Sequence, residues 1–226
     1  MRTKSLLAAA AITAAGLASS LAQSNVYSLN VVGYVNTVIV GGGSYNLICN
    51  PLNNTSANGN SSTNLFSNAA GPQRPTSQLL TWDVVSFDFD VAQPSFGATV
   101  WDSSIQLPVG KGFFYVNNGA DFTNTFVGEV VQGSYTNFIT GSGSYNCIGS
   151  SVPVGGSFTN AIGGLVPAGT DQVLTWDIPT FDFKLVQPSF GATTWDTTAL
   201  NVTVGEGLFY VRNGANQNWV RNFTVQ

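Results

Sequence analysis

The sequence predicts an all-β protein made of two tandem copies of one domain, each an antiparallel β-sandwich or barrel-like fold with one short helical turn. Charged residues make up only 8% of the 226 residues, against about 25% in ordinary soluble domains. Short runs rich in Val, Ile, Phe and Tyr are separated at close spacing by Gly, Asn and Ser, a pattern typical of strands and turns. A long segment of the chain also occurs twice.

The duplication defines the domain organisation. The segment Gln78–Asp102 matches Gln172–Asp196 at 17 of 25 positions. Val109–Val116 recurs in the same way as Val204–Val211, and Gly43–Ile48 recurs as Gly143–Ile148. Internal repetition of this kind indicates one structural unit used twice. We therefore expect a signal peptide over 1–22, a first β repeat domain over 23–129 and a second over 130–226.

The N-terminal segment has the pattern of a Sec-type signal peptide. Arg2 and Lys4 precede a short Ala-rich apolar stretch, and Ser20-Leu21-Ala22 is a small-x-small cleavage site. The pattern predicts a mature chain that begins at Gln23 and is exported to the cell envelope or the extracellular space. No later segment is apolar over the length that a transmembrane helix needs.

The strands follow in order along each copy. In copy one we expect Val26–Val40, broken at Gly33, and then a strand in which Tyr45, Leu47 and Cys49 share one face. An Asn-rich loop over 50–62 leads to a helical turn that begins at Ser62 or Thr63. The remaining expected strands are Leu79–Asp83, Phe87–Ala92, Ala98–Asp102, Gly112–Asn117 and Phe122–Val127.

A pair of glycines precedes the most apolar of these strands. Gly110 and Gly112 in copy one correspond to Gly205 and Gly207 in copy two. The successive apolar residues that follow predict a central strand covered on both faces, and the glycines predict a turn with positive φ or a bulge. The residue between them is Lys111 in one copy and Glu206 in the other, which favours a solvated turn tip over a phosphate-binding loop.

The two cysteines, Cys49 and Cys147, leave two interpretations open. An exported chain permits a disulfide between them, and two buried free thiols are the alternative. The repeat places Cys147 at the position of Leu47. Both side chains are therefore expected to point into the core of their own copy, which disfavours a bridge unless the copies share a core.

Several motifs resemble an exported bacterial family of all-β repeat proteins whose function is uncharacterised. They are the opening segment Asn25–Val35, the Gly-Ser-Tyr-Asn-Leu-Ile-x-Asn-Pro-Leu segment at 43–52, Trp82-Asp83, and the Val-Gly-x-Gly-Phe-Phe segment at 109–114. The resemblance covers essentially the whole mature chain. It implies a secreted repeat protein and brings no catalytic residues.

Composition excludes several function classes. The chain has no histidine, so His-based catalytic triads and metal sites are excluded. Neither glutamate, Glu129 or Glu206, recurs in the other copy, and the acidic net charge of −4 comes without a basic patch. We expect no enzymatic activity, no cofactor or metal, and no nucleic-acid partner.

Three aspartates recur in both copies, as Asp83/Asp177, Asp88/Asp182 and Asp102/Asp196. Asp83 and Asp102 each follow a Trp at a strand end, where an Asp side chain commonly caps a turn. A calcium pair at Asp88 and Asp90 is the alternative. The residue of copy two that corresponds to Asp90 is Lys184, which disfavours a calcium site.

The leading functional hypothesis is an exported, non-enzymatic structural or adhesive protein of the envelope or secreted matrix, with other matrix proteins as partners. The alternative is a carbohydrate-binding module, because sugars bind exposed aromatic rings flanked by polar side chains. Oligomeric state stays open. The candidate glycan-facing residues are Trp82, Asp83, Phe96, Trp101, Asp102, Trp176, Asp177, Phe190, Trp195 and Asp196.

Overall fold

The computed structural model describes residues 31–66, 77–94, 101–157, 159, 162–189, 192, 194–195 and 201–225. The predicted signal peptide, most of the expected strand Ala98–Asp102 and the candidate residues Phe96, Phe190 and Asp196 lie outside these residues. Both copies belong to one compact unit, 31–226. No helix in the described part of the chain is long and apolar enough to span a membrane.

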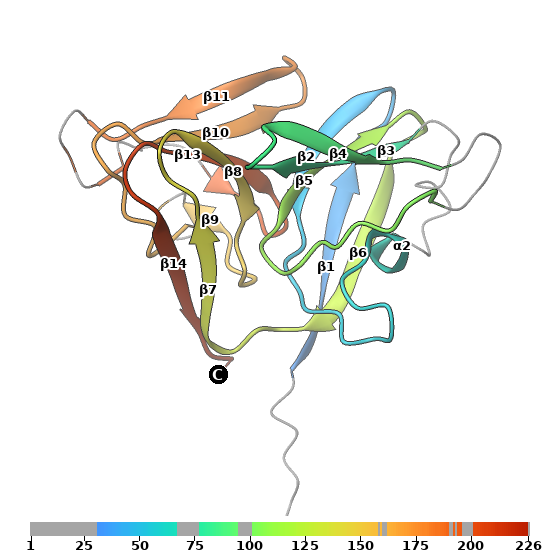
Figure 1. The fold of residues 1–226 in the computed structure, drawn as a ribbon. Coiled ribbons are helices and arrows are strands. Elements are labelled where there is room, and N and C mark those ends of the chain that lie inside the picture. Colours follow the sequence, from blue (N-terminus) through green and yellow to red (C-terminus); the bar gives the residue numbers. More distant parts are fainter. Residues whose placement is uncertain are drawn as a thin grey trace, which may run out of the picture. The chain divides into compact units, whose positions relative to one another are not determined.

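In its described residues, copy one consists of two antiparallel sheets and one helical turn (Figure 1). The four-stranded sheet has the order β2-β5-β3-β4, and β1 pairs with β6 in a two-stranded sheet. The expected helical turn is confirmed as α2, with Ser61 as N-cap. The elements are β1 Val32–Ile39, β2 Ser44–Cys49, α2 Ser62–Leu65, β3 Gln78–Asp83, β4 Asp88–Ala92, β5 Gly112–Asn117 and β6 Phe122–Glu129.

Copy two repeats this arrangement. Its four-stranded sheet has the order β8-β13-β10-β11, and β7 pairs with β14. Of the segment expected to form its helical turn, Ser157 ends strand β9, which pairs with β12, and Thr159 has helical conformation, whereas 158 and 160–161 lie outside the described residues. The strands are β7 Gly133–Ile139, β8 Ser144–Gly149, β9 Gly156–Ser157, β10 Gln172–Asp177, β11 Asp182–Val186, β12 Asn201–Val202, β13 Gly207–Arg212 and β14 Gln217–Phe223.

Each copy has its own hydrophobic core. In copy one, Phe113 and Tyr115 of β5 pack with Phe66 and Phe126 beside α2. In copy two, Tyr210 and Trp219 occupy the corresponding region. Strand β5 is buried at every residue and lies between β2 and β3. The prediction of a central strand covered on both faces is therefore confirmed, as is the all-β fold.

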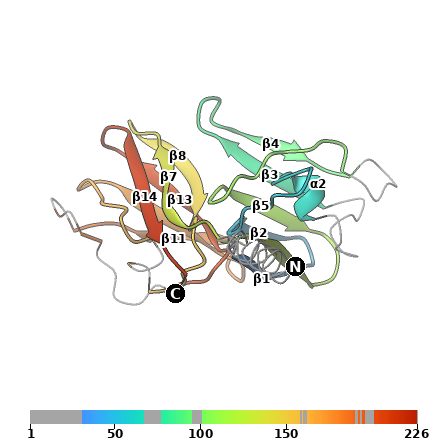
Figure 2. The same ribbon diagram turned by 90° about the horizontal axis from the view of Figure 1, so that it is seen from below.

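A third apolar cluster joins the copies, which lie side by side in Figure 2. It contains Leu47 and Phe114 from copy one and Cys147 and Phe209 from copy two. The expectation that the face bearing Leu47, Cys49 and Cys147 points into its own copy was wrong. Both faces of β2 are apolar, and it is Ile48, on the opposite face, that packs in the copy-one core.

Candidate functional site: an aromatic pocket between the copies

Each copy extends a hairpin whose tryptophan contacts the other copy. Trp82, in the β3–β4 hairpin, lies 6.3 Å from Tyr145 and 6.0 Å from Phe209, measured between ring centroids. Trp176, in the β10–β11 hairpin, lies 6.3 Å from Tyr45 and 5.6 Å from Phe114. The contacts are reciprocal, since each residue of one pair has its repeat equivalent in the other. In Figure 1 the two hairpins lie along the top of the molecule, and each reaches toward the opposite copy.

These contacts enclose a pocket of about 360 Å³ that opens to solvent. Its lining residues are all apolar or aromatic and form five repeat-equivalent pairs. The volume is within the range of small-molecule sites, at roughly 300–1,000 Å³. The pairs are Tyr45/Tyr145, Leu80/Leu174, Trp82/Trp176, Phe89/Phe183 and Phe114/Phe209.

The two tryptophans also carry unpaired polar groups, although the pocket surface itself is apolar. The Nε1 atoms of Trp82 and Trp176 are both buried and have no hydrogen-bond partner among the described residues. A buried indole N–H usually finds a partner, and leaving one unpaired costs about 1–3 kcal/mol. The two N–H groups are thus repeat-equivalent unpaired donors that lie in the pocket wall beneath an entirely apolar surface.

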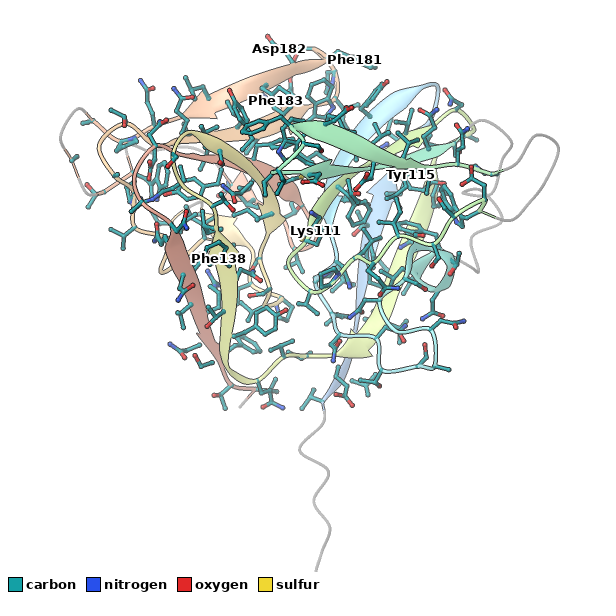
Figure 3. All side chains as sticks on the ribbon, in the orientation of Figure 1. Lys111, Tyr115, Phe138, Phe181, Asp182 and Phe183 are labelled. Carbon is teal, nitrogen blue, oxygen red and sulfur yellow. The ribbon has the colours of Figure 1, made fainter. Side chains whose placement is uncertain are left out.

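The hairpin tips carry an unusual backbone conformation beside the pocket. Phe87 has φ of 55° and Phe181 has φ of 51°, in the left-handed region that bulky residues rarely adopt. Their side chains are 57% and 54% exposed. Each ring contacts the tryptophan of its own hairpin, at 6.3 Å for Phe87 and 6.1 Å for Phe181. Figure 3 shows Phe181 at the tip of the β10–β11 hairpin.

Backbone-to-backbone contacts between the copies explain the repeated glycines. The N–H of Gly149 donates to Gly110 O at 2.9 Å, and the N–H of Cys49 donates to Gly205 O at 2.8 Å. A Cβ at Gly112 would lie 2.7 Å from Ile148 N, and one at Gly207 would lie 2.7 Å from Ile48 O. These glycines are required because a strand of the other copy lies against them.

The expectation of a solvated tip at Lys111 and Glu206 was wrong. Lys111 is partly buried, pairs as an isolated bridge with Ile148 of copy two, and donates from Nζ to Trp82 O at 3.0 Å. Figure 3 places it between the copies. Glu206 forms the equivalent bridge with Ile48. As predicted, Gly110 and Gly205 have positive φ, 77° and 87°.

Cys49 and Cys147 are free, buried thiols at the contact between the copies. The Cys49 side chain fills the space above Gly149, where an added Cβ would lie 2.2 Å from Sγ. Burial, with a smaller contribution from the charge of Glu206, raises the pKa of Cys49 to about 12. Burial likewise raises the pKa of Cys147. Both thiols are therefore protonated at neutral pH and lack nucleophilic reactivity.

The structure does not gather the candidate glycan-facing tryptophans on one face. Trp101 is 8% exposed in the core of copy one, and Trp195 packs against the core of copy two, with its Nε1 donating to Leu165 O at 2.9 Å. Trp82 and Trp176 face the neighbouring copy instead. Sequence comparison of the copies does not separate these two environments, because all four residues recur.

The recurrent aspartates in the described part of the chain accept hydrogen bonds from nearby backbone and side-chain groups. Asp83 Oδ1 accepts the N–H of Val85 at 2.7 Å, and Asp102 Oδ1 accepts that of Gln93 at 3.1 Å. Asp177 accepts from Lys184 at 2.8 Å and from Thr180, and these two hydrogen bonds hold its pKa below the usual value. Among the described residues no cluster of three acidic or sulfur ligands could hold a metal.

Comparisons with protein-family models, with curated proteins and with solved structures find no match for this chain. Sequence reasoning identified Trp82 and Trp176 but missed Tyr45, Leu80, Phe114 and their equivalents. The signal that could have found them is the position of Tyr45 and Phe114, which are repeated aromatics on the strand faces opposite their own core.

Proposed function

We propose that the chain is an exported, non-enzymatic binding protein, of the structural or adhesive kind, that holds an apolar ring-bearing group in the pocket between its two copies. The reciprocal aromatic lining is the observation that carries this proposal. Edge-to-face contacts such as Trp82–Phe209, with an interplanar angle of 82°, leave ring faces available to a flat guest.

The unpaired indole N–H groups define the guest further. Trp82 and Trp176 each hold an unpaired donor buried in the pocket wall. If a bound ring turns one indole so that its N–H reaches the pocket, a carbonyl or ether oxygen on that ring gains a hydrogen bond that a plain hydrocarbon lacks. Such a bond contributes about 0.5–1.5 kcal/mol. The guest class is therefore an aromatic ring system with a neutral acceptor.

The pocket offers less to a sugar. Pyranose hydroxyls need several polar partners beside the aromatic ring, and no Asp, Asn or Gln lines this pocket. Asp83 and Asp177, the candidates nearest the tryptophans in sequence, are engaged in their own hairpin turns. We therefore favour an aromatic guest over a sugar, and the titration below tests both.

Calorimetric titration of the mature chain with a matched ligand pair tests the proposal. We expect 2-acetylnaphthalene to bind at one site per chain, and about tenfold more tightly than 2-ethylnaphthalene, which has the same shape without the acceptor. Soluble oligosaccharides should produce no heat of binding. Sugar binding without naphthyl binding would overturn the proposal in favour of the carbohydrate alternative.

Filling the pocket provides the matched control. Leu80→Phe and Leu174→Phe add a ring from equivalent positions of the two copies, and each should weaken naphthyl binding. Val85→Phe adds the same ring at an exposed hairpin tip outside the pocket lining and should leave binding unchanged. Equal behaviour of all three variants would place the ligand elsewhere and contradict the proposal.

A further inference from the structure

The two four-stranded sheets each end in an exposed strand. Strand β4 pairs only with β3, and β11 pairs only with β10, among the described strands. Val91 of β4 is 47% exposed and Leu185 of β11 is 51% exposed. An open strand edge presents unpaired backbone groups that another strand can use.

Hydrogen bonding shows which residues face outward on β4. Trp82 lies opposite Phe89, yet its carbonyl accepts from Lys111, which immediately precedes β5. Because antiparallel pairs alternate between hydrogen-bonded and non-hydrogen-bonded, the backbone groups of Phe89 then point to the free edge. The N–H of Phe89 accordingly donates to Asp88 Oδ1 at 2.7 Å. By the same alternation, Val91 also faces the free edge.

Strand β11 has the same arrangement. The N–H of Phe183 donates to Asp182 Oδ1 at 2.7 Å, so Phe183 and, two residues further on, Leu185 face outward. Figure 3 shows Asp182 and Phe183 at the start of this strand. In both strands the aspartate occupies only the first outward N–H, which leaves the next one, at Val91 or Leu185, for a partner strand.

The two edges are complementary in charge and in register. Placing Asp90 of β4 opposite Lys184 of β11 in antiparallel orientation sets Phe89 against Leu185 and Val91 against Phe183. In all four of these apolar residues the backbone N–H and C=O groups point to the free edge, as a hydrogen-bonded pair requires. Asp90 and Lys184 then form a non-hydrogen-bonded pair, in which side chains lie closest and opposite charges stabilise the sheet.

We propose that β4 of one molecule pairs with β11 of a second copy of this chain, joining their four-stranded sheets. The contact is heterologous, because it uses a different edge on each partner, and it therefore leaves a β11 and a β4 free to continue the assembly. This inference does not rest on the proposed ligand.

The existing ion pair of Lys184 does not prevent this contact. Lys184 Nζ lies 2.8 Å from Asp177 Oδ1, and the Lys184 side chain remains 62% exposed. Exposed ion pairs of this kind contribute little to stability. Asp90 has no ion pair among the described residues, so Lys184 gains a second carboxylate on association.

Sedimentation of charge-reversed variants tests the assembly. The mature wild-type chain should sediment as species larger than one chain, increasingly so as its concentration rises and less so in high salt. Asp90→Lys and Lys184→Asp should each be monomeric, because each variant alone sets like charges opposite one another. A mixture of the two variants should associate again, since the Lys at position 90 of one meets the Asp at position 184 of the other.

A double variant with the same charge change provides the control. Thr123→Lys combined with Val127→Lys adds two positive units to exposed positions of β6 and should leave wild-type association intact. A wild-type chain that remains monomeric at every concentration would overturn the inference. So would a mixture of the two reversed variants that stays monomeric while both remain folded by circular dichroism.

Discussion

The ring of Trp82 in the first copy lies 6.0 Å from the ring of Phe209 in the second, edge to face at 82°. The repeat-equivalent contact, Trp176 with Phe114, is 5.6 Å at 85°. Aromatic pairs of this geometry contribute about 0.5–1.5 kcal/mol beyond the area they bury. The duplicated chain thus obtains from its second copy both a stabilising interface and the walls of a pocket.

Gly149→Ala should destabilise the protein by about 1–3 kcal/mol, since it forces extra volume into a packed contact. The added Cβ would lie 2.2 Å from Cys49 Sγ and 2.9 Å from Glu206 O. Gly214→Ala is the matched control, because its Cβ would meet only the end of the Arg212 side chain, at 3.1 Å. Urea unfolding measures both. Equal effects of the two substitutions would contradict the close approach of the copies.

Gly112→Val should also destabilise copy one by more than about 1 kcal/mol. On the sequence alone, the positive φ or bulge predicted for this glycine pair would be the reason, because valine would strain it. The structure gives another reason, since Gly112 has no positive φ and a Cβ there would lie 2.8 Å from Cys147 Sγ. The compensating variant Gly112→Ala with Cys147→Ala should therefore recover part of the loss in a double-mutant cycle. Additive effects would indicate that the Cys147 thiol does not limit the space at Gly112.

Phe87→Asn should stabilise the protein by about 1 kcal/mol, because Asn tolerates the left-handed conformation better than a bulky residue. Phe181→Asn should behave alike in copy two. The exposed ring has little burial to lose. Ser86→Asn, at the neighbouring exposed position, should give no gain. Thermal melts provide the measurement, and a loss of stability at both Phe positions would show that the ring contact with tryptophan outweighs the strain.

Acid should destabilise copy two through Asp171. Burial alone would raise the pKa of this carboxyl, but hydrogen bonds from Tyr210, from the N–H groups of Ala168 and Asn213, and from Arg212 hold it below the usual value. A depressed pKa contributes stability above the unfolded value of about 3.9, and that stability is lost as pH falls through the folded pKa.

The first copy supplies the matched control for this titration, since Ser77 stands at the position of Asp171. Asp171→Ser should lower stability at neutral pH and flatten its dependence on pH below about 4. Denaturant midpoints recorded from pH 3 to pH 7 would measure the slope. An unchanged slope in the variant would show that other carboxyls control acid unfolding.

Both thiols should resist Ellman's reagent in the native protein at pH 8, because burial raises the pKa of Cys49 to about 12 and also raises that of Cys147. Two thiols per chain should react after unfolding in denaturant. A rapid reaction in the native state would contradict their burial. Absence of reactive thiols after unfolding would demonstrate a bridge between Cys49 and Cys147.

The sequence indicated most of the strands but not their partners. The break expected at Gly33 is absent, since Gly33 pairs with Gly128 within the continuous strand β1. Gly112–Asn117 was predicted with its observed bounds, because an apolar run between glycine and asparagine leaves little choice. Neither alternation nor repetition indicated which face of β2 meets the other copy, since Leu47 and Ile48 are both apolar. Because the two copies have matching residues, the sequence also does not distinguish a contact of Trp82 with its own copy from a contact with the other copy.

The location of a bound ring shows whether the aromatic pocket is a ligand site. A crystal of the mature chain grown with 2-acetyl-6-bromonaphthalene would report the ligand through the anomalous signal of bromine. We expect one bromine position per chain, in contact with the rings of Trp82 and Trp176, and an acetyl oxygen that accepts from one of their Nε1 atoms. Bromine bound only outside the pocket, or a pocket closed by its own side chains, would contradict it.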